Sequence, residues 1–437
     1  MAFADLFLGI DLGTSSVRCT AIDENEDQIA ASKVDLPLPE NPGSGQFNQN
    51  PDLWWQATLD CLIQLGEKTS LLQVKAISVD GTSSTVLLTD SNNQPISTAL
   101  MYNDSRSASM LELVEDIVPQ QHLSRSASSS LLKSLWLLNN TGEVESFITH
   151  QADWVLGKLA GQNGISDENN CLKLGFDSVH KIWPGWMQKL PFKFINKLPE
   201  VHSTSEIAGN VSETVAQQTG LPVNTQVYFG TTDSTASTLA TGVSRPGQAV
   251  TTLGTTMVMK TLTTSPVDEF RYGLYSHKLP DELWLTGGAS NAGGNILLKH
   301  FSIDEIKQLS ELINPDKATG LNYYPLPSPG ERFPINDPYL TPCLEPRPSS
   351  DVIFLTAIFE GLAKIEKLAY EKIAELGGTW PSEIISSGGK AAKNPAFTAI
   401  RQRILGIPVK TANHTEASYG SALIAKRGWE KAKKKAG

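Results

Sequence analysis

Apolar runs alternate with amphipathic segments along the whole chain. Three strands are predicted over residues 6–36, where LFLGID is apolar, SVRCTAID alternates, and QIAASKVDLPL follows the polar turn DENED. An amphipathic helix is predicted from about 51 to 66, after a proline and an aspartate that favour a helix start. The next apolar strand, VKAISVDG at 74–81, carries an acid near its end, as the first strand does.

The alternation of strands and helices continues beyond these elements. Residues 129–140 and 151–161 have helical patterns. Residues 226–242 predict a strand, then a turn that holds Asp233, then a helix of small residues. This alternation indicates an α/β architecture.

The pattern of the first strands returns at about residue 246. PGQAVTTLGTTMVMKTL (246–262) predicts a strand, a Gly-Thr-Thr turn and a returning strand, like 6–22 with its Gly-Thr-Ser-Ser turn. We therefore expect two domains, over 1–243 and 244–413. The last helix, about 414–432, is a candidate to pack back on the first domain.

The second half contains a loop-rich segment and several further elements. Residues 320–348 are rich in proline and glycine and are expected to form an ordered surface excursion. After it we expect a long helix at 350–377, a strand at 382–389, another helix, a short strand at 406–410, and the last helix from about 416.

Composition and charge narrow the class of protein. The 437 residues are 40% hydrophobic and 19% charged, which is typical of a globular protein with a sizeable core. A net charge of −10 leaves no broad basic field for nucleic acid or anionic lipid. No apolar run approaches the ~18 residues of a membrane span. We expect no nucleic acid and no membrane as partner, and either a monomer or a homodimer.

Cysteine spacing and missing motifs exclude several kinds of site. Four distant cysteines form no Cys-x-x-Cys pair, which argues against a zinc site and a disulfide framework. We expect a cytoplasmic protein in a reducing cytosol, with a plastid as the alternative if a targeting segment was removed. No GxxxxGK[ST], no GxGxxG after a strand and no HExxH occurs.

The stretch LGIDLGTSS (8–16) places an acid before a turn of glycine and hydroxyl residues. The carboxylate of Asp11 is suited to a divalent cation, and Gly13 lets the backbone approach a phosphate closely. The N–H groups of such a turn, with the hydroxyls of Thr14 and Ser15, form an anion-binding concavity. On these residues alone, a phosphate site and an ordinary hairpin turn are equally favoured.

A second Gly-Thr turn, Gly254 and Thr255, shifts this balance, because two such turns can hold one polyphosphate from both sides. Asp233 follows a strand in GTTDST, where a carboxylate can accept a proton from an attacking hydroxyl. The alternative for Asp233 is capping of the next helix, which is the favoured role for this residue taken alone.

Several motifs, in order and over essentially the whole chain, resemble the FGGY family of carbohydrate kinases. IDLGTSS and TLGTT resemble its two phosphate motifs, and GQFNQNPDLWW resembles its G-W-x-E-Q-x-P-x-x-W-W segment. MYNDSRS resembles W-x-D-x-R, SSLLKSLWL resembles P-K-x-x-W-L, and PGERFP resembles G-E-R-x-P. HQADWVLGKLAG with SDENNCLKLGFD resembles the D-x-L-x-x-x-L-T-G … T-D-x-S-N-A-S run, and SGGKAAKN the adenosine motif.

This resemblance implies two ribonuclease H-like domains with an interdomain cleft, as in the superfamily of actin, Hsp70 and the sugar kinases. It implies ATP and Mg²⁺ as cofactors and a small-molecule sugar as the substrate. VDGTSSTVLL, GTTDSTA, YGLYSHKL, LTGGASNAGG and LNYYPLPSPGERFPI resemble a short plant and cyanobacterial branch, often labelled xylulokinase-like. The activity associated with that branch is phosphorylation of D-ribulose.

The resemblance also implies a role for each matching residue. Asp233 matches the catalytic base, and Asp11 the acid that serves the metal, with Asp233 as a further metal ligand. The implied sugar-binding residues are Asp11, Asp80, Ser83, Asp233 and Ser234. The implied nucleotide- and phosphate-binding residues are Gly13, Thr14, Ser15, Gly254, Thr255, Gly388, Gly389 and Asn394.

Some positions depart from the family pattern. Asn48 stands where the family has glutamate, Tyr102 where it has tryptophan, and Ser234 where Gln or Asn often follows the base. Lys390 interrupts the usual Gly-Gly-Gly-Ala, and matching Asn394 requires a shift of one. The adenine contacts are therefore the part of the site that the sequence specifies least.

The sequence as a whole predicts an ATP-dependent kinase that converts D-ribulose to D-ribulose 5-phosphate. D-xylulose, or another ketose or polyol, is the alternative substrate. An ATP-hydrolysing conformational switch of the actin or Hsp70 type, without a sugar acceptor, is the alternative from another class, and a kinase-like binding protein is a third. The segments 45–55, 80–84 and 102–106 favour the kinase, because a switch would not need them.

Overall fold

The chain folds into two compact units, each a mixture of strands and helices. The computed structural model describes residues 4–142 and 145–436. Unit 1 contains the chain up to Ala240 and again from Glu416 onward, and unit 2 contains Thr241–Thr415. The α/β class predicted from the sequence is confirmed in both units.

A six-stranded sheet forms the centre of unit 1, in the order β12-β13-β6-β1-β2-β3. Strand β1 pairs antiparallel with β2 and parallel with β6, and β6 pairs parallel with β13. The carboxyl ends of β1, β6 and β13 therefore meet at one edge of the sheet. The strands are β1 (Leu6–Leu12), β2 (Ser16–Ile22), β3 (Gln28–Asp35), β6 (Val74–Gly81), β12 (Ile207–Asn210) and β13 (Gln226–Thr232).

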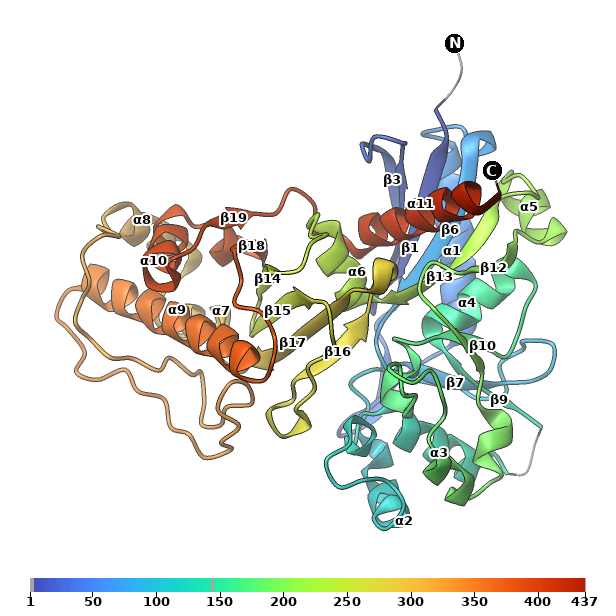
Figure 1. Ribbon diagram of the computed structural model, residues 1–437, viewed down its shortest axis with the longest axis horizontal. Helices are drawn as coiled ribbons and strands as arrows, with labels where there is room; N and C mark the ends of the chain where they lie inside the picture. Colours follow the sequence, from blue (N-terminus) through green and yellow to red (C-terminus); the bar gives the residue numbers. More distant parts are fainter. Residues whose placement is uncertain (1–3, 143–144, 437) are drawn as a thin grey trace. The chain divides into compact units, whose positions relative to one another are not determined.

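Helices cover both faces of this sheet because successive side chains of a strand point to opposite faces. Leu8 and Ile10 of β1 belong to the same apolar cluster as Trp54, on the face covered by α1, α4 and α5. Phe7 packs in a second cluster with Leu423 of α11, which crosses the sheet in Figure 1. The helices are α1 (Pro51–Gly66), α4 (Gln151–Ala160), α5 (Glu213–Thr219), α6 (Asp233–Ala240) and α11 (Ala417–Ala436).

A second sheet of unit 1 has five strands in the order β4-β5-β8-β7-β9. Helix α3 (Ser130–Thr141) packs against it, and Leu132 joins Leu88 and Ile148 in a third apolar cluster. The short helix α2 (Leu111–Val114) and the pair β10 (Ile165–Asp167) and β11 (Glu200–His202) complete this part. The five strands are β4 (Glu40–Gly43), β5 (Gln46–Gln49), β7 (Val86–Thr89), β8 (Ala99–Leu100) and β9 (Phe147–His150).

Unit 2 is built on another six-stranded sheet, in the order β16-β17-β15-β14-β18-β19. Strand β14 pairs antiparallel with β15 and parallel with β18, as β1 does with β2 and β6. The strands are β14 (Gln248–Leu253), β15 (Met257–Thr263), β16 (Tyr275–Lys278), β17 (Trp284–Ser290), β18 (Glu383–Gly388) and β19 (Val409–Thr411). The helices are α7 (Gly294–His300), α8 (Ile303–Glu311), α9 (Asp351–Glu375) and α10 (Pro395–Leu405).

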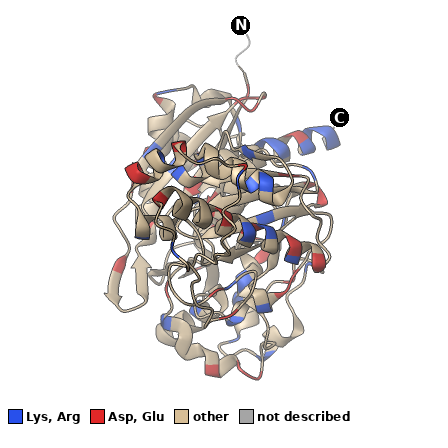
Figure 2. Ribbon diagram, turned by 90° about the vertical axis from the view of Figure 1, so that its left-hand side faces the viewer, with Lys and Arg blue, Asp and Glu red and all other residues tan. Residues whose placement is uncertain are grey.

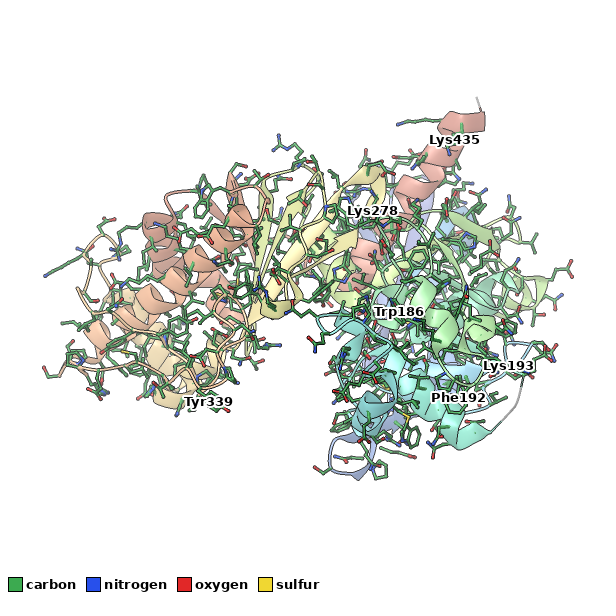
Figure 3. The ribbon with its side chains drawn as sticks, turned by 60° about the horizontal axis from the view of Figure 1, so that its bottom comes forward. Trp186, Phe192, Lys193, Lys278, Tyr339 and Lys435 are labelled. Carbon is green, nitrogen blue, oxygen red and sulfur yellow. The ribbon has the colours of Figure 1, made fainter. Side chains whose placement is uncertain are left out.

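The segment 320–348 differs in one respect from its prediction. It forms no helix or named strand, as expected, but Leu326 and Phe333 are fully buried in the apolar core of unit 2. The segment is therefore part of the core as well as of the surface, where Tyr339 is 84% exposed (Figure 3).

Most predicted elements are confirmed within a residue or two at each end. The turn expected around Asp233 is wrong: β13 ends at Thr232 and α6 begins at Asp233 with no residue between them. The last turns of α11 are rich in lysine, a local basic end on an acidic chain (Figure 2). In the described part of the chain, no helix is both long and apolar enough to cross a bilayer.

Candidate active site

Three aspartates lie where three neighbouring strands of unit 1 end. Asp11 of β1 is in register with Asp80 of β6, and Asp80 is in register with Thr231 of β13. Asp233 begins α6 immediately after β13. The parallel pairing of β1, β6 and β13 thus gathers side chains from three distant parts of the sequence at one edge of the sheet.

Asp11 is buried, with only 5% of its surface exposed. Its Oδ2 accepts a hydrogen bond of 3.2 Å from Nη1 of Arg18, which lies directly across the β1–β2 hairpin. Burial raises the pKa of Asp11 above its ordinary value, and the positive charge of Arg18 opposes this rise. Arg18 therefore favours the carboxylate form at a position where burial disfavours it.

Asp80 is fully buried, and its Oδ2 accepts a hydrogen bond of 2.6 Å from Ser421 Oγ of α11. Burial, and then the negative charges of Asp11 and Asp233, raise the pKa of Asp80 well above its ordinary value. A raised pKa shifts Asp80 toward its protonated form, and a protonated carboxyl can donate a hydrogen bond to a neighbouring carboxylate. The sequence predicts that Asp80 contacts the sugar, but its side chain is buried inside unit 1 and is not part of the cavity wall described below.

A cavity of about 420 Å³ opens beside these acids, within unit 1. It brings together four of the predicted site residues, Gly13, Thr14, Ser83 and Asp233, from three separate segments. Its remaining wall is formed by Thr82, Tyr102, Ser128 and Lys173. Hydroxyl groups, one acid and one lysine give this wall the polar character that a small polyhydroxylated molecule requires.

Two loops at the cavity are held by hydrogen bonds, one within the main chain and one to a glutamine side chain. In the β1–β2 turn, Gly13 N–H donates to the Ser16 carbonyl at 3.0 Å. In the loop after β6, the N–H and Oγ1 of Thr82 both donate to Oε1 of Gln151, at 3.0 and 2.7 Å. Ser15 and Ser234, two further predicted site residues, are exposed and lie outside the cavity wall.

In unit 2, four predicted nucleotide-side residues meet at the corresponding edge of the six-stranded sheet: Gly254, Thr255, Gly388 and Gly389. Leu253 is in register with Gly388, and Gly389 N–H donates to the Leu253 carbonyl at 3.1 Å. Gly254 and Thr255 follow immediately and are exposed. The second Gly-Thr turn and the Gly388–Gly389 turn are thus adjacent, with their main chain accessible.

Glycine is required at Gly388 and at Gly293 by close approach of main chain. Gly388 has φ +109°, and a Cβ there would lie 2.5 Å from the Leu253 carbonyl oxygen. A Cβ at Gly293 would lie 2.6 Å from the Thr255 carbonyl oxygen. Packing against the turn therefore accounts for Gly293 in GGASNAGGN.

Asn394 has a structural function in unit 2. Its Oδ1 accepts from Phe397 N–H and so caps α10, and its Nδ2 donates to Ser310 Oγ at 2.8 Å. Both polar atoms of the side chain already have partners within the protein. Of the predicted adenine-side residues, the two glycines present the more accessible main chain.

Sequence reasoning assigned no role to several residues that shape the site. Lys173 and Ser128 line the cavity, Arg18 contacts Asp11, and Ser421 contacts Asp80. The contact of Arg18 could have been predicted from the sequence, because a tight hairpin places Arg18 opposite Asp11 and oppositely charged cross-strand pairs are favourable. Ser421 lies 341 residues from Asp80, and no local pattern predicts their contact.

Comparison with known proteins shows the family of this chain. Two family models match, the N-terminal domain of the FGGY family of carbohydrate kinases over residues 6–240 and the C-terminal domain over 249–429. The chain belongs to the FGGY family of carbohydrate kinases. It is therefore a carbohydrate kinase, with the fold of the sugar kinases in the actin and Hsp70 superfamily, as the resemblance implied.

Relatives of this FGGY kinase span nearly its full length. It is 26% identical to the xylulose kinase of Staphylococcus epidermidis, over 97% of this chain and 88% of that protein. Among solved structures, the xylulose kinase of Rhodospirillum rubrum is similar in fold, with a TM-score of 0.83, 20% identity and coverage of 96% and 89%. Glycerol kinase of Plasmodium falciparum with ADP has a TM-score of 0.82, 19% identity and coverage of 98% and 91%.

Proposed function

We propose that this carbohydrate kinase transfers the γ-phosphoryl group of ATP to the terminal hydroxyl of a ketopentose, converting D-ribulose to D-ribulose 5-phosphate. One observation carries the proposal: the Asp233 carboxylate shares the cavity of unit 1 with the Gly13–Thr14 turn and the hydroxyl of Ser83. A proton acceptor, a phosphate-binding turn and a sugar-binding hydroxyl are the groups that phosphoryl transfer to a sugar needs.

Each group has a defined part in the proposed reaction. Asp233 orients the sugar hydroxyl and accepts its proton as the oxygen attacks phosphorus. Thr14 donates its N–H and hydroxyl to the phosphoryl oxygens, where negative charge is spread in the transition state. The N–H of Gly13 is bonded to the Ser16 carbonyl, and the missing side chain of this glycine lets the phosphate approach the turn closely. In unit 2, Gly254 and Thr255 hold the polyphosphate, and the Gly388–Gly389 turn takes the adenosine side.

Mg²⁺ fits this arrangement as an ion held jointly with ATP. In the described residues, no group of three or more His, Cys, Asp or Glu side chains is arranged to hold a metal. Mg²⁺ in kinases commonly keeps several waters and uses one or two carboxylates together with substrate phosphates. Asp11, and Asp233 beside the cavity, would supply those carboxylates, and the bound ion would neutralise phosphate charge.

Asp80 supports Asp11 in this proposal. Its buried carboxyl contacts Asp11 and Ser421, and the protonated form supplies a hydrogen bond that keeps Asp11 at the end of β1. A sugar contact through Asp80 would require unit 1 to expose a group that is now fully buried. Ser83, in the cavity wall, is the better-placed sugar contact.

D-xylulose is the second candidate substrate. The observation that favours it is the name of a full-length relative, the Staphylococcus epidermidis xylulose kinase. D-ribulose and D-xylulose differ only in the configuration of one hydroxyl-bearing carbon, so either one matches a wall of hydroxyl groups, Tyr102 and Lys173.

The test is ADP release by the purified protein with Mg-ATP. D-ribulose, D-xylulose, L-ribulose, glycerol and a sugar-free reaction would be compared at equal concentration, with the phosphorylated carbon assigned by ³¹P-coupled NMR. We expect the highest kcat/KM with D-ribulose, and we expect the phosphate on the oxygen of its C5. A higher kcat/KM with D-xylulose would change the proposed substrate and leave the proposed mechanism unchanged. An equal rate of ADP release with every sugar and without sugar would support the ATPase switch.

A further inference from the structure

Lys133 is a fully buried cation in α3 that lies outside the cavity wall. Its Nζ donates to the Ser84 carbonyl at 3.0 Å and to the Met101 carbonyl at 2.6 Å. These two carbonyls belong to different loops, one between β6 and β7 and one after β8. A single side chain thus connects two segments that the sequence separates.

Each of these loops supplies a residue of the cavity wall. Ser83 precedes Ser84, and Tyr102 follows Met101 through the peptide whose carbonyl Lys133 holds. The Met101 carbonyl also accepts from Asp104 N–H at 2.9 Å, so the bond from Lys133 joins an existing turn. Lys133 is therefore bonded to the main chain directly beside two residues of the cavity wall, Ser83 and Tyr102.

Ser84 adds a second, independent observation. Its φ of +68° lies in the left-handed region, a strained conformation that non-glycine residues keep only where their surroundings impose it. The hydrogen bond from Lys133 to the Ser84 carbonyl is such an imposed constraint. It keeps the main chain of the loop in one conformation beside Ser83.

The lysine supplies the hydrogen-bond donor that the Ser84 carbonyl uses. An unbranched apolar side chain would avoid the cost of burying an ammonium group, but it would leave the Ser84 carbonyl without this donor and the two loops without their common partner. Burial lowers the pKa of Lys133 to about 7, although Asp104 raises it and Lys173 lowers it further. Both the ammonium and the neutral amine carry at least two N–H donors, so the two carbonyls stay bonded on either side of this pH.

We infer that Lys133 is a positioning residue for the sugar: it ties the Ser84 and Met101 loops together and thereby sets the width of the cavity between Ser83 and Tyr102. The inference rests on the proposed function, because it concerns the cavity in which that proposal places the sugar. It assigns Lys133 no contact with substrate, and it makes sugar affinity the property that this lysine controls.

The test compares Lys133→Met with Lys68→Met, whose wild-type Nζ also donates to a main-chain carbonyl, that of Ala31, at 2.6 Å. Lys68 lies outside the cavity wall. For the better of D-ribulose and D-xylulose, we expect Lys133→Met to raise the sugar KM at least ~10-fold, the effect of losing about one charge-assisted hydrogen bond. The KM for ATP should stay within ~3-fold, and Lys68→Met should leave both unchanged.

Conservative rescue and hydrogen exchange complete the experiment. Lys133→Arg keeps N–H donors and should restore the sugar KM toward the wild-type value. Amide exchange in peptides covering 82–86 and 99–104 should accelerate together in Lys133→Met and not in Lys68→Met. If Lys133→Met does not fold, Lys133→Gln takes its place, because its shorter side chain cannot reach both carbonyls.

The outcomes separate this inference from the proposed function. Unchanged sugar KM and unchanged exchange in both peptides would overturn the inference while leaving the kinase mechanism in place. If the wild-type protein phosphorylates no sugar, the proposed function fails, and exchange in the two peptides still decides whether Lys133 holds the loops. Faster exchange throughout unit 1, rather than in the two peptides, would show a general packing role and would also overturn the inference.

Discussion

The two units use the same strand pairing to present different chemistry. In each, a strand pairs antiparallel with the strand after it and parallel with a later strand, and a glycine turn joins the first pair. At the strand ends of unit 1, Asp11 is in register with Asp80. At the equivalent place in unit 2, two residues before the turn glycine, Thr252 is in register with Ser387.

Under the proposed function, this difference divides one fold between two tasks. Carboxylates at the edge of unit 1 can accept a proton and serve a metal ion. Glycines and hydroxyls at the edge of unit 2 present accessible main chain without negative charge, which is what a polyphosphate requires. On this account, substitutions in unit 1 alter the chemical step, and equivalent substitutions in unit 2 alter nucleotide binding.

The largest effect is expected for Asp233→Asn. Loss of a general base lowers kcat by ~10²–10⁴-fold, while the amide keeps the size of the side chain at the start of α6. The matched control is Asp351→Asn, because Asp351 is likewise the first residue of a helix, α9, and is exposed. Steady-state ADP release measures both, and equal losses in the two variants would contradict the assignment of Asp233 as base.

A smaller effect is expected for Asp11→Asn, tested against Thr252→Ala at the equivalent place in unit 2. A carboxylate that serves Mg²⁺ through water typically contributes ~10–100-fold to activity or metal affinity. The Asp11 variant should therefore need more Mg²⁺ for half-maximal rate, and the Thr252 variant should not. A Mg²⁺ titration at saturating ATP and sugar makes the comparison, and an unchanged titration for Asp11→Asn would exclude it from the metal site.

Nucleotide binding should respond to Gly388→Ala and not to Gly377→Ala. Both glycines have a positive φ, +109° and +103°, so both variants carry the same left-handed strain of about 1–2 kcal/mol. Only at Gly388 would the new methyl also collide, at 2.5 Å, with the Leu253 carbonyl oxygen. We expect a rise of ~10-fold in the KM for ATP for Gly388→Ala alone, where each 1.4 kcal/mol is tenfold. Equal KM values for ATP in the two variants would remove this turn from the nucleotide site.

The smallest effect is expected on stability, for Asp80→Asn. Because the pKa of Asp80 is raised in the folded protein, the native state binds more protons than the unfolded state above the ordinary Asp range. Its contribution to the free energy of unfolding therefore falls as pH rises from about 4 toward the raised pKa. Asn, which mimics the protonated acid and keeps the Ser421 contact, should raise Tm by a few degrees at pH 8 and not at pH 4. Thermal unfolding of both proteins between pH 4 and pH 8 measures this difference. An equal rise in Tm at both pH values would contradict the raised pKa of Asp80.

Much of the edge of unit 1 could be predicted from local patterns. The acids in LGID and SVDG mark strands that end on carboxylates, and the parallel pairing expected in an α/β fold brings such ends together. The β1–β2 hairpin is short enough that its register, and hence the Asp11–Arg18 pair, follows from the turn. The turn predicted at Asp233 was wrong because TTDST allows either a turn or an uninterrupted helix start.

Other parts of the site depend on contacts that no local pattern encodes. Ser421 reaches Asp80 only because α11 returns to the first sheet from the end of the chain. In SLLKSLWLL the apolar residues surround Lys133, so the pattern predicts a buried helix and gives no indication of what the ammonium bonds. Its partners are main-chain carbonyls of two loops, one joining the six-stranded sheet of unit 1 to its five-stranded sheet and one following β8 of the five-stranded sheet.

The most direct test of the division between the units is a single-turnover experiment on Asp233→Asn with γ-labelled ATP, Mg²⁺ and the best sugar, preceded by calorimetric binding of each ligand. The account predicts that this variant binds ATP and sugar about as tightly as the wild type, yet leaves the label on ATP. Transfer of the label to the sugar at the wild-type rate would contradict the central claim that the acidic edge of unit 1 performs the chemistry.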